Sequence, residues 1–123
     1  MVENTNDQIS EKSETTVAPQ VLLDITRLAA LGVEGVNQLA PVPGGVNRLF
    51  KRGASEGVQI IIDSNSVIAD IYVILEHHTN IRMVGREIQT QVARAISEMV
   101  GMDVGKVNVH VEDFANYPTP QSA

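Results

Sequence analysis

The chain has 123 residues, of which 43% are hydrophobic and only 3% aromatic, and its formal net charge is -6. This length suits a single domain whose core is built mostly from aliphatic side chains. The acidic balance argues against nucleic-acid binding and against direct contact with anionic lipid, and the absence of cysteine excludes disulfides and thiolate metal sites.

Composition divides the chain into three parts. Residues 1–16 are polar and acidic and predict a disordered tail, with a docking peptide as the functional alternative. Residues 17–115 are expected to form the domain, and residues 116–123 a short C-terminal tail. The sequence contains no run of about 18 consecutive apolar residues, the length that a membrane-spanning helix needs. The N-terminus does not resemble a signal peptide. We expect a cytoplasmic protein that reaches the membrane only peripherally, through a partner.

The first helix is expected to begin at Pro19, a residue suited to an initial helical turn. Helical spacing then gives one apolar stripe, formed by Val21, Leu22, Ile25, Leu28 and Ala29. Gly32 is placed to end the helix in the left-handed conformation. A short extended piece should reach residue 39, before the turn-forming cluster at residues 41–45.

Two strands are predicted at residues 57–63 and 67–75, joined as a hairpin through turn residues 64–66. Side chains alternate between the two faces of a strand. The cleaner apolar face of the second strand consists of Val67, Ala69, Ile71, Val73 and Leu75. Its other face consists of Ile68, Asp70, Tyr72 and Ile74. That face is only half polar, as is typical of a surface that another chain partly covers.

A long helix is predicted from residue 81 to residue 100, capped by Thr79 or Asn80 and stopped by Gly101. Its apolar side comprises Val84, Ile88, Val92, Ala95, Ile96 and Met99. A last strand is expected at residues 106–113, parallel to the strand at 67–75. The predicted fold is therefore α+β, a small three-stranded mixed sheet with two helices on one face, in the order α-β-β-α-β.

No residues group into a convincing catalytic, cofactor or metal site. The adjacent His77 and His78 should point to opposite sides of an extended chain, and a lone His110 on a polar strand face is usually solvated. Ser64 or Ser66 as a nucleophile could be paired with His77 as a base, but the sequence indicates no third catalytic residue and no oxyanion donor. We therefore expect no enzyme activity and no cofactor.

A nucleic-acid-binding module of the KH type is the alternative hypothesis. The segment from Gly32 to Gly35 has the Gly-x-x-Gly form of the loop that clamps a nucleic-acid backbone, and the order of elements resembles one KH topology. Glu34 inside the loop would repel phosphate, however, and no clear second helix follows. Reversal of the chain after a helix explains both glycines equally well.

Several segments together resemble the alkaline-shock-protein family of envelope stress-response proteins. They are Gly35-Val36 after the first helix, the hairpin at 57–75, the helix with Ile88-Gln89, and the ending at residues 101–111 that contains Val107-Asn108-Val109. The resemblance covers residues 19–114. It implies a non-enzymatic protein linked to cell-envelope homeostasis, which self-associates and is held at the membrane by a membrane-anchored partner.

If the chain self-associates, we expect one of two surfaces to mediate the contact. The first is the half-polar strand face with Ile61, Ile68, Tyr72 and Ile74. The second is a basic patch with Arg48, Lys51 and Arg52, which could meet an acidic surface. The alternative for the basic patch is an ordinary solvated loop.

Overall fold

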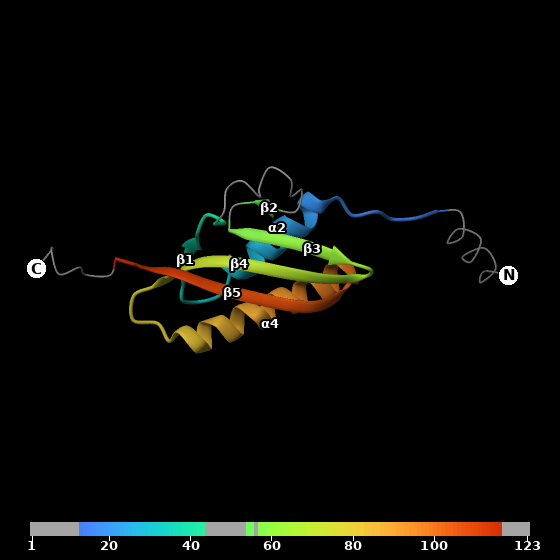
Figure 1. Ribbon diagram of the computed structural model, residues 1–123. Helices are drawn as coiled ribbons and strands as arrows, with labels where there is room; N and C mark the ends of the chain where they lie inside the picture. Colours follow the sequence, from blue (N-terminus) through green and yellow to red (C-terminus); the bar gives the residue numbers. More distant parts are fainter. Residues whose placement is uncertain (1–12, 44–53, 56, 117–123) are drawn as a thin grey trace, which may run out of the picture.

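The computed structural model describes residues 13–43, 54–55 and 57–116. Element labels follow Figure 1. In chain order the elements are α2 (Pro19–Leu31), β1 (Val36–Leu39), β2 (Ala54–Ser55), β3 (Val58–Asp63), β4 (Ser66–Glu76), α4 (Ile81–Val100) and β5 (Asp103–Ala115). Residues 13–16, the described part of the predicted N-terminal tail, form no regular secondary structure and are exposed.

One mixed sheet lies against one layer of helices. β4 is its central strand: it pairs in antiparallel fashion with β1 and β3 along one side and in parallel fashion with β5 along the other. β2 extends the sheet beyond β3. Figure 1 shows α2 and α4 behind the sheet on the same face. This confirms the α+β class, the mixed sheet and the placement of the helices, while β1 and β2 enlarge the sheet from the three expected strands to five.

The alternation along β4 decides where the core lies. Its helix-facing side chains are all fully buried: Val67, Ala69, Ile71, Val73 and Leu75. The intervening side chains, from Ile68 to Ile74, are half-buried and face away from the helices. β4 therefore separates the core from a second face, which we call the open face.

α4 begins and ends as predicted. The Asn80 side chain accepts a hydrogen bond from the Met83 backbone N–H at 3.0 Å, and Gly101 ends the helix in the left-handed conformation with φ of 78°. The buried side chains are Val84, Ile88, Val92 and Ile96. The expected burial of Met99 is wrong, because Val100 and Met102 pack against the core at this end instead.

The buried side of α2 is rotated relative to the predicted stripe. Leu22, Leu23, Thr26 and Ala30 are buried, whereas Val21 and Leu28 are exposed. Thr26 tolerates burial because its hydroxyl donates to the Leu22 carbonyl oxygen at 2.9 Å. Gly32 also differs from the prediction: its φ is -78°, and the left-handed residue of this turn is Gly35, with φ of 103°.

Neither α2 nor α4, the two helices in the described part of the chain, combines the length and the apolar character that crossing a bilayer requires.

Candidate interaction surfaces

A cluster of four polar and aromatic side chains occupies the middle of the open face. One carboxylate oxygen of Asp70, on β4, lies 3.2 Å from Asn108 Nδ2 and 2.9 Å from His110 Nε2, both on β5. The ring of His110 stacks on that of Tyr72, with centroids 4.4 Å apart and planes inclined by 13°. The cluster forms because parallel pairing sets Asn108 beside Asp70 and His110 beside Tyr72.

The Tyr72 phenol reports the electrostatics of this face. Partial burial raises its pKa above the ordinary value of 10.0, and the negative charges of Asp70 and Glu112 raise it further. Asp70 is the alternate neighbour of Tyr72 on β4, and Glu112 lies two residues beyond His110, the β5 residue paired with Tyr72. The neutral phenol is the stable form throughout the physiological range.

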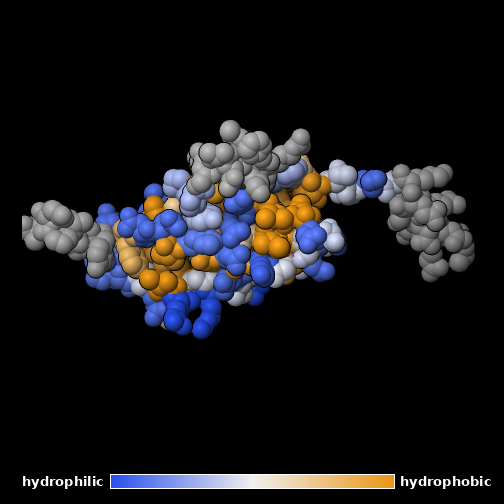
Figure 2. Space-filling view, in the orientation of Figure 1, coloured by the Kyte–Doolittle hydropathy of each residue, from blue (hydrophilic) through white to orange (hydrophobic). Residues whose placement is uncertain are grey.

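The structure brings together the four residues of the predicted strand surface. Ile61 lies opposite Ile68 across the β3–β4 pair, and Tyr72 and Ile74 follow at alternate positions of β4. Figure 2 shows the open face, on which a hydrophilic area separates two hydrophobic ones. The face therefore offers apolar contact area on both sides of a hydrogen-bonded centre. Arg48, Lys51 and Arg52, the predicted basic patch, lie outside the described residues.

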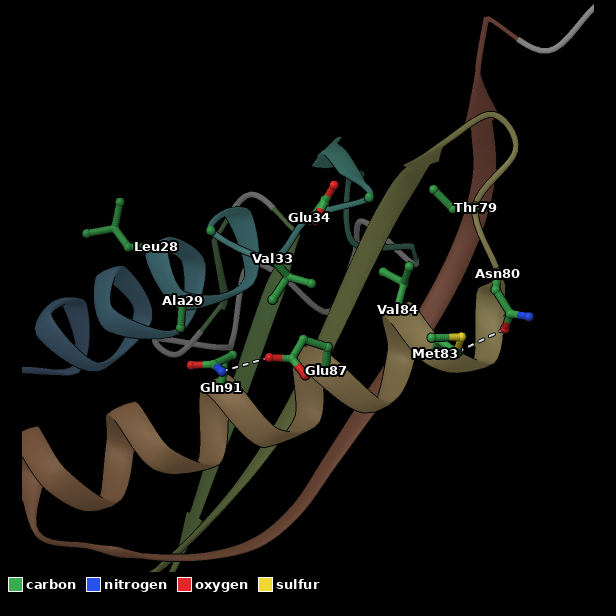
Figure 3. Close-up of a pocket in the computed structure, with 12 residues that line it drawn as sticks. Leu28, Ala29, Val33, Glu34, Thr79, Asn80, Met83, Val84, Glu87 and Gln91 are labelled. Carbon is green, nitrogen blue, oxygen red and sulfur yellow. Dashed lines mark hydrogen bonds between the residues drawn. The ribbon is translucent and has the colours of Figure 1, made fainter.

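A groove between α2 and α4 lies on the opposite side of the molecule (Figure 3). Its volume is about 840 Å³. Val33 and Val84 lie between the two helices, and Leu28 and Met83 on its margins are 64% and 66% exposed. The charged groups that line it are the carboxylates of Glu34 and Glu87. Such a groove suits an apolar side chain flanked by positive charges and repels an anion.

The segment from Gly32 to Gly35 borders this groove and joins α2 to β1 rather than to a second helix. A side chain at Gly35 would place its Cβ 2.8 Å from Val84 Cγ2, so close packing onto α4 accounts for this glycine. Glu34 is exposed at the turn. The geometry does not favour the KH-type hypothesis, because the clamp for a phosphate backbone would carry a carboxylate.

The residues considered for chemistry do not assemble into a catalytic site. Ser66 begins β4 and His77 follows its end, so the length of the strand, about 33 Å, separates them. Within the part of the chain that the structure describes, no three histidine, aspartate or glutamate side chains gather to hold a metal ion.

The expectation for His77 and His78 is wrong. Their rings lie side by side, with centroids 3.7 Å apart, because His78 adopts φ of 79° in a turn rather than an extended conformation.

Comparison with known proteins identifies the family. A family model described as the alkaline shock protein 23 family, with a cell envelope-related function, matches residues 7–115. The chain belongs to the alkaline shock protein 23 family. This membership confirms the resemblance drawn from the sequence. The family is not known as catalytic.

Two similar proteins extend the match. Spy1535 of Streptococcus pyogenes, named as an uncharacterized protein, is 33% identical over 109 residues, which cover 88% of this chain and 84% of that protein. YloU of Bacillus subtilis, also named as uncharacterized, is 27% identical over 82 residues, which cover 66% of this chain and 68% of that protein. No solved structure matches the chain significantly.

Proposed function

We propose that this member of the alkaline shock protein 23 family is a non-catalytic scaffold of the envelope stress response, which self-associates and is held at the membrane by a membrane-anchored partner. Membership of a family with a cell envelope-related function supports the setting. The observation that carries the scaffold is the open face, a sheet surface that neither described helix covers. The function rests on contacts rather than on chemistry.

The open face supports self-association through its uneven chemistry. Ile61 is 43% exposed, and Ile68 and Ile74 are half-buried, so each has apolar area left to bury. The cluster around Asp70 fixes the orientation of the polar side chains between them. Apolar area supplies affinity and fixed polar groups supply specificity, which is the usual division in a protein interface.

The test compares Ile61→Ser with Ile62→Ser in sedimentation velocity over a range of concentrations. The two residues are neighbours on β3 and are 43% and 50% exposed, but they point to opposite faces of the sheet. Ile61→Ser should weaken self-association about fivefold, since burying this exposed area is worth about 1 kcal/mol. Ile62→Ser, the matched control, should leave it unchanged. Equal effects of the two substitutions would argue against the open face, and a wild-type protein that stays monomeric would end the scaffold proposal.

The α2–α4 groove is the surface proposed for the membrane-anchored partner. Its exposed apolar side chains, Leu28 and Met83, and its carboxylates, Glu34 and Glu87, match a segment with large apolar residues next to basic ones. The chain itself carries a formal charge of -6, which disfavours direct adhesion to anionic lipid. A protein partner is therefore the better route to the membrane.

Binding to membrane vesicles separates a protein partner from lipid. The purified chain should co-sediment with vesicles from its native cells, but not with protease-treated vesicles or with liposomes made from the extracted lipids. Met83→Lys should lower binding to the untreated vesicles, because it replaces an exposed apolar side chain of the groove with a positive charge that repels the basic residues of the partner. Equal binding to liposomes would reject the protein partner, and full binding by the Met83 variant would reject the groove.

A further inference from the structure

The outer edge of β5 is a strand edge without a strand partner among the described residues. β5 is 13 residues long and pairs with β4 along one side only. Figure 1 shows it at the border of the sheet, with α4 below it. An edge of this kind presents unpaired N–H and C=O groups and is a template for another strand.

The pairing between β4 and β5 limits the part of this edge that is regular. Register shifts place extra residues at Gly105 and Glu112, and the register between them is continuous from Ile68 with Lys106 to Val73 with Val111. Bulges twist an edge and end its pairing. The stretch available to a further strand therefore runs from Lys106 to Val111, with Glu112 as the bulge residue at its end.

One hydrogen bond shows which backbone groups of β5 point outward. The Gln89 side chain of α4 donates from Nε2 to the Val107 carbonyl oxygen at 3.2 Å. Successive residues of a strand direct their backbone groups to alternate edges, so Val109 and Val111 point outward with Val107. These N–H and C=O groups can therefore serve a second strand without disturbing the pairing with β4.

The side chains of this stretch are complementary to those of a second, antiparallel copy of the same stretch. We propose that β5 pairs with β5 of a second copy in antiparallel fashion, about a two-fold axis at Val109. This register sets Lys106 opposite Glu112, Val107 opposite Val111, and Asn108 opposite His110. Each opposed pair is thus either oppositely charged, apolar or hydrogen-bonding, which is what stabilises neighbouring strands. The pairing is isologous, so it closes as a dimer.

The charged pair lies on one face of the joined sheet. Lys106 is set beside Ile68, a residue of the open face. Glu112 comes two residues after His110, which also lies on the open face, so the alternation of the strand places Glu112 there as well. Lys106 of each copy can therefore form an ion pair with Glu112 of the other, so the dimer contains two such pairs.

The space between β5 and α4 accommodates the valines of the second copy. Two hollows of about 370 and 290 Å³ lie along this edge, and Gln89 borders both. The first contains Ala93 and Val107 in its lining, and the second contains Val109 and Val111. In the proposed register the helix-side valines of the added strand lie over these hollows. Gln89 gives up its bond to Val107 when the second copy arrives.

Neighbouring registers are less complementary. An axis at Val111 sets Val109 opposite the carboxylate of Asp113. An axis at Val107 sets Lys106 opposite the neutral Asn108. The axis at Val109 is the arrangement that gives every charged residue of the stretch an opposite charge.

This inference rests on the proposed self-association and adds a contact at the β5 edge to the one on the open face, so charge reversal at the edge tests it separately. Lys106→Glu and Glu112→Lys should each weaken the dimer about tenfold or more in sedimentation equilibrium, because each creates two like-charge pairs. The double variant restores both pairs and should return to within about threefold of wild type. Arg94→Glu, an exposed reversal on α4, is the control and should change the dimer little. Val109→Pro, which removes the N–H at the axis, should abolish the dimer.

The outcomes separate the two proposals. A wild-type protein that stays monomeric overturns both. A protein that self-associates but shows no weakening in the single variants, or no recovery in the double variant, overturns the β5 pairing and leaves the scaffold standing. If Val109→Pro does not fold, the charge reversal alone decides the matter.

Discussion

The two faces of β4 have the same spacing of side chains but differ in burial and in composition. Toward the helices, residues from Val67 to Leu75 are fully buried and aliphatic, so packing determines each of them. On the open face, Ile68 and Ile74 remain half-buried around the bonded cluster of Asp70 and His110. The comparison teaches that the buried face specifies the fold, while the open face retains polar and apolar groups that the fold does not require.

The largest effect is expected on the buried face. Ile71→Ala removes a fully buried side chain from the middle of β4 and should lower the free energy of unfolding by about 2–5 kcal/mol. Urea denaturation followed by circular dichroism measures it. Ile61→Ala on the open face is the matched control and should cost less than about 1 kcal/mol. Similar losses for both variants would contradict the division between the faces.

An intermediate effect is expected at the centre of the open face. Asp70→Ala removes the acceptor shared by Asn108 and His110 and should cost about 1–2 kcal/mol. Asp63→Ala, an exposed carboxylate on the same face at the end of β3, should be nearly neutral. Equal stability of the two variants in urea would show that the cluster does not order this face.

The smallest effect concerns the Tyr72 phenol. Because its pKa is raised in the folded state, Tyr72 favours folding at pH values below the ordinary 10.0, and this contribution is lost as pH rises through the raised pKa. The stability advantage of wild type over Tyr72→Phe should therefore shrink above pH 10. The near-ultraviolet absorbance of tyrosinate should show Tyr72 ionising later than an ordinary tyrosine. Ionisation of Tyr72 at or below the ordinary value would contradict the crowding of carboxylates beside it.

Local sequence patterns predicted the elements with their own strong periodicity. The β3–β4 hairpin, the limits of α4 and the Asn80 cap follow from alternation, helical spacing and capping chemistry between near neighbours. The short strand β1 depends on β4, a partner far along the chain. β2 pairs with the neighbouring β3, but its two residues are too few to show an alternating pattern. The stripe on α2 was misjudged because Leu28 is apolar but exposed and Thr26 is polar but buried.

The candidate surfaces were only partly accessible to sequence reasoning. Alternation placed Ile61, Ile68, Tyr72 and Ile74 on one face, and the structure agrees. It did not place Asp70 beside His110. Those residues are neighbours because β4 pairs with β5, and a strand–helix–strand order permits this pairing but does not require it. The groove between α2 and α4 likewise depends on how two distant helices meet.

Localisation of the protein in its native cell tests the scaffold proposal most directly. A fluorescent fusion made at the native expression level should give a peripheral signal that follows the membrane. The proposed membrane-anchored partner would produce such a pattern. A uniform signal throughout the cell, or one that follows the nucleoid, would contradict an envelope scaffold.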